Sequence, residues 1–270
     1  MAALNVPMHG RYHRQELLPG IGQAGQARLA ASHALIVGMG ALGCQVADLL
    51  VRAGVATLTI IDRDVVELTN LQRQTLYCEA DAAEGRPKAL AAAARLAAVN
   101  SCVLVRPLVA DFSARNAEAI LAEANAVCPV GIIIDGADNF DTRYLMNDLA
   151  VKHGVPYIYG GVIACRGMMM ALRINENAPC LRCIFPDPPA PGSQMTCDTA
   201  GVLGSAVAIV GAHEAADAIK VLSGAGDTVP RTLLDFDLWM NQQRTITIGK
   251  AAHCICCVRR EFHFLSRANS

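Results

Sequence analysis

The sequence lacks the features that mark several large classes of protein. Charged residues make up only 17% of the 270 residues, the net charge is −1 and no long basic run occurs, which excludes a disordered chain and argues against nucleic acid as the main partner. The longest apolar stretch, residues 200–212, is shorter than the roughly 20 residues of a membrane-spanning helix and contains three glycines. The chain does not open with a basic patch followed by an apolar segment, so we expect no secretory signal and a cytoplasmic location.

Apolar and helical segments alternate over the first 160 residues, after an arm and short helix in residues 1–32. We expect strands at 34–37, 57–61, 102–107, 130–135 and 156–159, with helices after residue 43 and at about 87–99, 114–126 and 144–153. This alternation is typical of a parallel sheet with helices on both faces. Beyond residue 160 we expect antiparallel strands within 161–174, an apolar helix at 204–222 and strands at 232–236 and 244–248. The sequence therefore predicts an α/β fold whose mostly parallel sheet is continued by antiparallel strands.

A glycine-rich turn, GMGALG, follows the first expected strand and opens a helix. Its glycines, Gly38, Gly40 and Gly43, leave room for a nucleotide to approach the backbone, and the helix N-terminus offers N–H donors to phosphate. Asp62 ends the second strand, where a carboxylate can accept hydrogen bonds from ribose hydroxyls. These features predict an adenine nucleotide but do not separate ATP from NAD, so an NAD-dependent oxidoreductase remains an alternative.

Three features favour ATP. The TNLQRQ loop places Asn70 and Arg73 soon after Asp62, and Asp138-Asn139 follows the fourth strand, where a carboxylate could hold Mg²⁺ against phosphate. Lys88 lies in the first turn of a helix, where a cation opposes the helix dipole by roughly 0.3–1 kcal/mol unless an anion is near. Taken singly, a surface lysine and an ordinary turn explain these residues equally well; together they indicate a triphosphate site.

Eleven cysteines stand out in a chain of this composition. Two CxxC pairs, Cys180 with Cys183 and Cys254 with Cys257, could place four thiolates around one tetrahedral ion, and all-thiolate coordination is typical of structural zinc. A redox dithiol or free thiols are the alternatives, and Cys256 could replace Cys257 as a ligand.

Cys197 stands alone in TCDTAGVLG, before the apolar helix. A thiol near a helix N-terminus can have a lowered pKa, so Cys197 is a candidate nucleophile or transfer thiol, with burial as a small apolar side chain the alternative. The six remaining cysteines are interpreted as packing residues: Cys44, Cys78, Cys102, Cys128, Cys165 and Cys256.

Taken in order, RYHRQ, GMGALG, NLQRQTL, GRPK, DNFDTR, CLRC, TCDTAGVLG, EAADAIKVLSG and the final CxxC resemble the bacterial ThiF/MoeB/HesA family from about residue 11 to residue 257. Members of this family adenylate ubiquitin-like sulfur-carrier proteins and are related to ubiquitin-activating enzymes. The resemblance implies a homodimer with a Rossmann-like, ATP-binding part at 33–160 and a mixed-sheet extension with a crossover loop and the zinc site at 161–270, within one continuous domain. The chain departs from many relatives at Ala41, where they have a further glycine.

The resemblance also implies roles for individual residues. The nucleotide would contact Gly38, Gly40, Ala41, Gly43, Asp62 and Asp64; its phosphates would contact Asn70, Arg73 and Lys88; Asp138 beside Asn139 would bind Mg²⁺; Arg14 would reach the partner subunit's site; and Cys197 matches a cysteine that in some members links to the carrier.

The implied reaction joins the carrier's C-terminal Gly-Gly carboxylate to the α-phosphate of ATP and releases pyrophosphate, for molybdopterin, thiamine or related biosynthesis. No rhodanese domain follows the last CxxC, so we expect a separate sulfur donor, such as a cysteine desulfurase or a rhodanese. The competing hypotheses are the NAD-dependent oxidoreductase, a non-catalytic scaffold that binds a carrier, and the related tRNA-modifying branch.

Overall fold

One eight-stranded sheet forms the centre of the molecule, with strand order β3-β2-β1-β4-β5-β6-β7-β8. The computed structural model describes residues 8–172, 175, 177–189 and 197–267. Five strands are parallel: β1 (His33–Val37), β2 (Thr57–Ile61), β3 (Leu104–Leu108), β4 (Ile132–Asp135) and β5 (Tyr157–Ile163). Three more continue the sheet antiparallel: β6 (Arg166–Leu172), β7 (Thr232–Asp237) and β8 (Gln242–Thr247). The predicted mixed sheet is confirmed.

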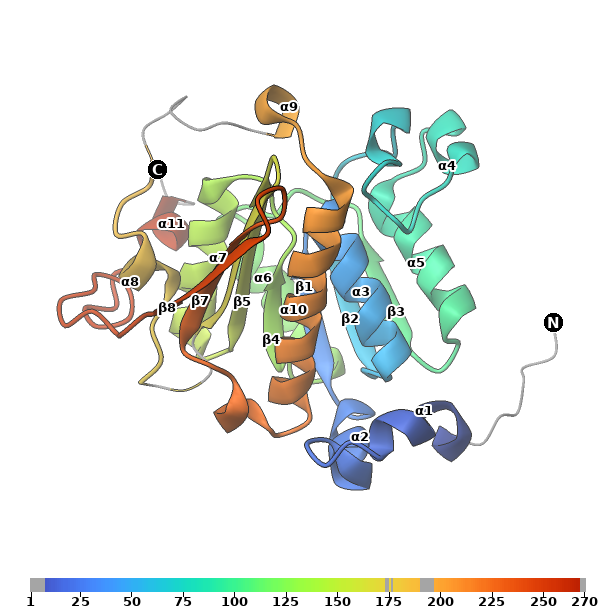
Figure 1. The fold of residues 1–270 in the computed structure, drawn as a ribbon, viewed down its shortest axis with the longest axis horizontal. Helices are drawn as coiled ribbons and strands as arrows, with labels where there is room; N and C mark the ends of the chain where they lie inside the picture. Colours follow the sequence, from blue (N-terminus) through green and yellow to red (C-terminus); the bar gives the residue numbers. More distant parts are fainter. Residues whose placement is uncertain (1–7, 173–174, 176, 190–196, 268–270) are drawn as a thin grey trace.

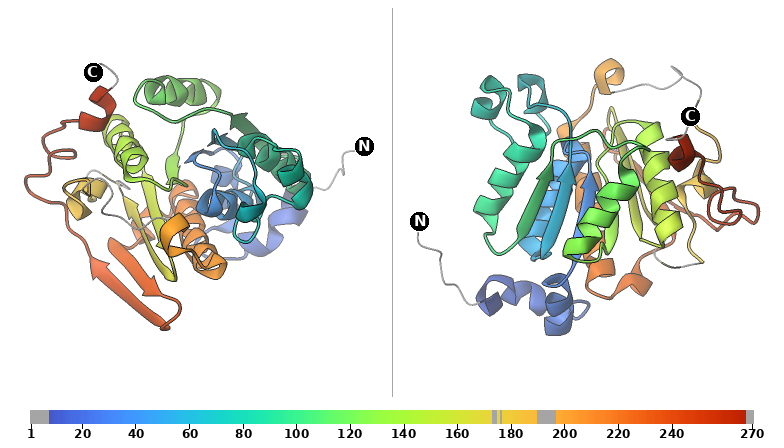
Figure 2. Two further views of the ribbon diagram at one scale, coloured as in Figure 1. Left: turned by 90° about the horizontal axis from the view of Figure 1, so that it is seen from above. Right: turned by 180° about the vertical axis from the view of Figure 1, so that it is seen from behind.

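Helices cover both faces of the parallel part (Figures 1 and 2). The first face packs against α3 (Ala41–Ala53), α5 (Lys88–Val99) and α10 (Gly204–Leu222), and the second against α6 (Ala117–Val127) and α7 (Phe140–His153). Successive residues of β4 alternate between the two cores: Ile132 and Ile134 join the first, and Ile133 joins the second. Burial on both faces explains why the central strands β1 and β4 are mostly apolar rather than alternating with polar residues.

Two helices, rather than the single one expected, precede β1. They are α1 (Met8–Glu16) and α2 (Gly22–Leu29), and Gly22 begins α2 with a φ of +58° that favours glycine. Arg11 donates to the carbonyl of Val99 over 3.1 Å, at the end of α5. This contact fixes α1 beside the amino ends of the parallel strands, at the opposite end of the sheet from α4 and α9 (Figure 1).

Some boundaries differ from the sequence expectation for local reasons. Helix α7 begins four residues early because the Asn139 side chain accepts the Thr142 amide at 2.9 Å and caps the helix. Strand β5 continues past Tyr159 through two glycines, because it pairs with β6 along its whole length. The sequence predicts a loop at TNLQRQ, but the structure has the 3-10 helix η1 (Leu68–Asn70) at its start. Helix α4 (Glu79–Ala83) follows further along the same segment.

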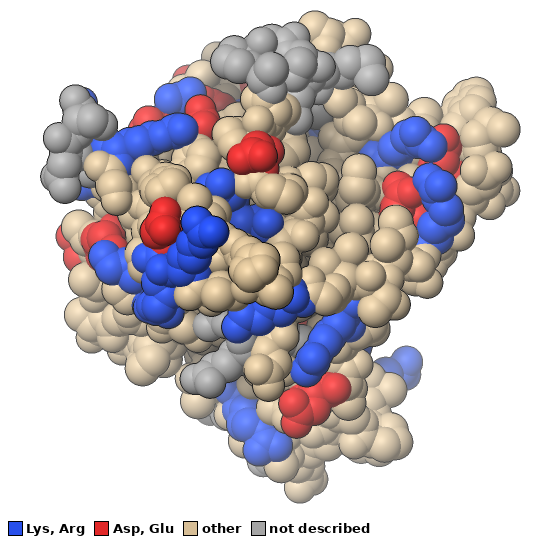
Figure 3. Space-filling view, turned by 90° about the vertical axis from the view of Figure 1, so that its left-hand side faces the viewer, with Lys and Arg blue, Asp and Glu red and all other residues tan. Residues whose placement is uncertain are grey.

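Four short elements belong to the extension: α8 (Leu181–Ile184), α9 (Cys197–Ala200), the 3-10 helix η2 (Gly226–Thr228) and α11 (His263–Ser266). On the face that carries β8 and α8, basic and acidic side chains are interspersed (Figure 3). Two ion pairs join this part of the sheet, Arg244 with Asp235 at 2.7 Å and Arg166 with Asp237 at 3.3 Å. Across the described part of the chain, every helix is too short or too polar to span a bilayer.

Candidate functional site

The glycine-rich turn between β1 and α3 contains three glycines, Gly38, Gly40 and Gly43, which have different structural roles. A Cβ atom on Gly38, whose φ is +91°, would overlap the carbonyl oxygen of Gly136, and one on Gly43 would overlap the carbonyl oxygen of Gly38. Both glycines are therefore required for the close packing of the turn. A Cβ on Gly40 would meet its nearest atoms only at 3.9 and 4.0 Å. Gly40 thus leaves open space above the turn, as a bound phosphate would need.

Asp62 holds this turn in place. One carboxylate oxygen accepts the Met39 amide at 2.7 Å, and the other accepts the Asp64 amide at 2.8 Å. Burial raises the pKa of Asp62 above its ordinary value. The sequence assigned this carboxylate to ribose hydroxyls. The structure adds a second task, and the remaining lone pairs of both oxygens are still able to accept those hydroxyls.

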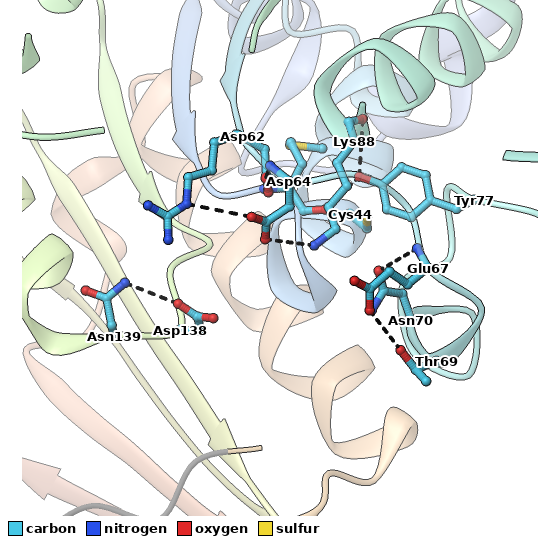
Figure 4. A network of polar contacts seen from close by, with 12 residues as sticks. Cys44, Asp62, Asp64, Glu67, Thr69, Asn70, Tyr77, Lys88, Asp138 and Asn139 are labelled. Atoms are coloured by element: carbon cyan, nitrogen blue, oxygen red, sulfur yellow. Dashed lines mark hydrogen bonds and ion pairs between the residues drawn. The ribbon is translucent and has the colours of Figure 1, made fainter. Parts of the chain in front are cut away.

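Lys88 forms an ion pair with Asp64, with 3.1 Å between Nζ and Oδ2 (Figure 4). The lysine side chain is only 9% exposed, whereas that of Asp64 is 55% exposed. The sequence argument that this lysine needs a bound anion to balance the helix dipole is therefore incomplete, because Asp64 already supplies a carboxylate. The pair still presents a cation with a buried stem at the edge of the site.

Asn70 and Arg73 stand on the segment that follows β2. The Asn70 side-chain oxygen accepts the Glu67 amide at 3.1 Å and caps η1, and Arg73 donates to the carbonyl of Thr69 at 3.0 Å. Asn70 is buried and Arg73 is partly exposed. Both residues are thus held by local contacts, with the guanidinium still open to solvent.

Asp138 and Asn139 follow β4 after Gly136 and Ala137, and they face the same region as Asp64 and Lys88 (Figure 4). Asp138 is exposed, and its carboxylate accepts a hydrogen bond from the side-chain amide of Asn139 at 3.2 Å. An exposed carboxylate at the carboxyl edge of a parallel sheet fits Mg²⁺, which is commonly bound by one or two carboxylates together with substrate phosphates.

The two CxxC pairs come together at one point of the extension. The four sulfur atoms of Cys180, Cys183, Cys254 and Cys257 lie within 4.8 Å of one another, and the distances from Cys180 to Cys254 and from Cys183 to Cys257 are both 3.6 Å. A tetrahedral zinc ion with bonds of about 2.3 Å requires sulfur separations of about 3.8 Å, so the cluster has the dimensions of such a site.

Cys256 lies outside this four-sulfur cluster. Its thiol donates to Asp148 at 3.3 Å and accepts the Asn147 side-chain amide at 3.3 Å, both on α7. The alternative in which Cys256 replaces Cys257 as a ligand therefore has no support from the geometry, and Cys256 fills the predicted packing role.

Comparison with known proteins now decides the family, because the ThiF family model matches residues 12–258. The chain belongs to the ThiF family. It is 42% identical over 264 residues to the sulfur carrier protein ThiS adenylyltransferase of Bacillus subtilis, covering 97% of this chain and 75% of that protein. It is 40% identical to the sulfur carrier protein adenylyltransferase of Thermus thermophilus, over 92% of this chain and 90% of the relative.

A mouse relative, adenylyltransferase and sulfurtransferase MOCS3, is 36% identical, over 95% of this chain and 54% of that protein. The crystal structure of MccB from E. coli superposes with a TM-score of 0.77 at 20% identity, over 94% of this chain and 73% of MccB. This second likeness concerns the fold alone. The prediction of an adenylating enzyme of this family is confirmed.

Two predicted residues of the ThiF-family chain do not join the cluster at the carboxyl edge. Arg14 is exposed in the last turn of α1, which lies at the other end of the sheet. Cys197 begins α9, and its side chain lies outside the described residues.

Sequence reasoning missed three side chains of this ThiF-family site. Gln74 is 4% exposed, its carbonyl oxygen has no hydrogen-bond partner among the described residues, and its amide nitrogen approaches the open side of Gly40. Tyr77 donates to the carbonyl of Met39 at 2.7 Å. Arg143 holds the backbone beside Asp138. Gln74 lies within NLQRQTL, Tyr77 directly follows that motif, and Arg143 lies within DNFDTR. Only the contacts in the folded protein show what these side chains touch.

Proposed function

We propose that this chain transfers the adenylyl group of ATP to the C-terminal Gly-Gly carboxylate of a ubiquitin-like sulfur-carrier protein, with release of pyrophosphate. The observation that carries the proposal is the gathering of the glycine turn, the buried Lys88 and the exposed Asp138 at the carboxyl edge of a parallel sheet in a ThiF-family chain. Named relatives act on sulfur carriers, which supports the substrate class. The pathway would be molybdopterin, thiamine or related sulfur transfer.

The chain's own residues position and neutralise rather than abstract a proton. A carboxylate is already a nucleophile, so its oxygen attacks the α-phosphorus, a new oxygen–phosphorus bond forms, and the bond to the β-phosphate oxygen breaks. Gly40, Ala41 and the first N–H groups of α3 cradle phosphate oxygens, and Asp62 accepts ribose hydroxyls. Asn70, Arg73 and Lys88 then stabilise the charge that develops on the phosphates.

Asp138, beside Asn139, would hold the magnesium ion. When bound, this ion neutralises charge on the phosphate oxygens. The zinc ligands would be Cys180, Cys183, Cys254 and Cys257, with a structural role, because four thiolates leave no open position for a substrate.

Three further assignments belong to this proposal. The enzyme works as a homodimer in which Arg14 enters the site of the partner, since α1 is remote from the carboxyl edge of its own sheet. Sulfur comes from a separate cytoplasmic protein, a cysteine desulfurase or a rhodanese, in the same compartment as this chain. Cys197 either attacks the acyl-adenylate, forming a thioester and releasing AMP, or joins the sulfur relay.

Pyrophosphate exchange tests the reaction. The purified protein should incorporate labelled pyrophosphate into ATP only when a Gly-Gly carrier is present, and the D138A variant should lose about 100-fold in exchange rate. Tight binding of NAD without binding of ATP would favour the oxidoreductase. Normal carrier binding without exchange would favour the scaffold. Exchange that D138A leaves unchanged would overturn the magnesium assignment.

A further inference from the structure

A buried ion pair lies directly beneath the Asp138 loop. Asp135, the last residue of β4, is fully buried, and the Nε of Arg143 lies 3.2 Å from its Oδ2. Tyr157 donates to the same oxygen at 2.8 Å. Burying two charges costs desolvation energy, and well-packed apolar residues often stabilise a fold equally well. The pair therefore calls for a role besides stability.

Both members of the pair grip the peptide that precedes Asp138. The Ala137 amide donates to Asp135 Oδ1 at 3.0 Å, and Arg143 Nη2 donates to the Ala137 carbonyl at 2.8 Å. The backbone at Ala137 is thus held on both sides. Asp138 itself is exposed, and among the described residues its side chain hydrogen-bonds only to its neighbour Asn139. The direction of the Asp138 carboxylate therefore depends on how the Ala137 backbone is held.

The guanidinium of Arg143 is itself immobilised. Its Nη2 also donates to the Gly160 carbonyl of β5 at 3.1 Å, and the group lies over the rings of Phe140 at 5.2 Å and Tyr159 at 5.5 Å. The planar guanidinium can contact the Asp135 carboxylate, two backbone carbonyls and two aromatic rings at once, whereas the single ammonium of lysine cannot. The loop is thereby tied to β5, where the sheet changes from parallel to antiparallel pairing.

We propose that Arg143, fixed by Asp135, is the positioning residue that aims the Asp138 carboxylate at the metal–triphosphate. The inference rests on the proposed function of Asp138. It predicts that magnesium raises the affinity for the nucleotide only when the guanidinium of Arg143 is present, although this group does not contact the nucleotide. The conservative R143K variant keeps the charge and loses the planar guanidinium.

The test is calorimetric binding of a non-hydrolysable ATP analogue with and without Mg²⁺, on the full-length protein. The ratio of the affinities with and without magnesium should be at least about tenfold smaller for R143K than for wild type. The affinity of R143K without magnesium should stay within about threefold of wild type. In pyrophosphate exchange, kcat should fall while the KM for the carrier is unchanged. The matched control is R182K, because Arg182 is equally buried and stacks on Tyr144 but donates to the Pro186 carbonyl.

The outcomes separate the two claims. A wild-type protein without any magnesium-dependent gain would overturn the proposed function and this inference with it. A wild-type gain that R143K retains, or an R143K loss that is equal with and without magnesium, would overturn the inference alone. Should R143K not fold, the double variant D135N/R143Q leaves no unpaired buried charge and carries the same expectation.

Discussion

The ammonium of Lys88 lies 3.1 Å from the Asp64 carboxylate, and only the lysine of this pair is buried. Because the lysine side chain is buried, its aliphatic part is held in place, whereas the Asp64 carboxylate is screened by solvent. A phosphate that binds at the site can therefore contact the ammonium of Lys88 without displacing a buried carboxylate. Replacing Lys88 by Met should reduce pyrophosphate exchange by about 100-fold, because a charge-stabilising group at the reacting phosphates is lost.

The matched control is K152M. Lys152 on α7 pairs with Glu118 on α6, and the lysine side chain is 45% exposed, so K152M should change neither exchange nor the melting temperature appreciably. Equal exchange rates for K88M and K152M would contradict the phosphate assignment.

Two glycines of the turn should respond in opposite ways. G40A places its methyl group in open space, so the protein should fold with nearly wild-type stability but bind the ATP analogue at least about tenfold more weakly. G43A overlaps the Gly38 carbonyl and should lower the melting temperature of the free protein. Thermal unfolding and calorimetry on both variants check this. Normal ATP affinity in G40A would mean that the phosphate lies elsewhere.

The cysteine cluster predicts one zinc per chain. C183S should lose the metal and melt at a lower temperature, since a structural zinc site contributes directly to folding. C256S should keep full zinc content, because Cys256 hydrogen-bonds to Asn147 and Asp148 instead. Metal analysis of the purified variants decides between them, and zinc loss in C256S with retention in C183S would reverse the assignment.

Glu214, on α10, predicts an unusual dependence of stability on pH. It is fully buried, and neither carboxyl oxygen has a hydrogen-bond partner among the described residues. Burial raises the pKa of Glu214 well above its ordinary 4.5, Asp135 on β4 raises it further, and Arg143 on α7 opposes them. Between pH 4.5 and the raised pKa, Glu214 therefore stays protonated in the folded protein but is ionised in the unfolded chain.

The resulting stability is present in full below pH 4.5 and is lost as the pH rises through the folded pKa. E214Q removes this dependence. Relative to E214Q, the wild type should lose up to about 1.4 kcal/mol of unfolding free energy per pH unit above 4.5, until the folded pKa is reached. Denaturant unfolding across pH measures it, and parallel curves for the two proteins would contradict the neutral state.

Subunit mixing tests the assignment of Arg14. R14A and D138A homodimers should both be inactive, but after subunit exchange half of the dimers are mixed and carry one complete site each. Exchange activity should then recover to about a quarter of the wild-type level. If the mixture stays inactive while the subunits demonstrably exchange, Arg14 does not serve the partner.

Local patterns predicted the parts of this protein that local chemistry determines. The glycine spacing, the apolar strands and the CxxC pairs each specify a short piece of geometry, and all were confirmed as structure. The choice between Cys256 and Cys257 stayed open because one residue of spacing cannot say which thiol turns toward α7.

Tertiary pairing set the limits of prediction. The sequence proposed Asp64 and Lys88 separately as nucleotide contacts, yet nothing in it showed that they pair. Asp62 was assigned to ribose without its two backbone partners, because those amides approach it only after the turn folds. Arg143 is the last residue of the DNFDTR motif, which does not show what its side chain contacts. Its hydrogen bond to the Ala137 carbonyl forms only when helix α7 packs over the end of β4.

The most direct test of the central claim is the mass of the carrier itself. The purified protein, incubated with ATP, Mg²⁺ and a ubiquitin-like carrier ending in Gly-Gly, should convert the carrier to its acyl-adenylate, with one pyrophosphate released for each carrier modified. A carrier lacking the terminal glycine should remain unmodified. An unmodified Gly-Gly carrier under these conditions, or release of ADP and phosphate in place of pyrophosphate, would contradict the account.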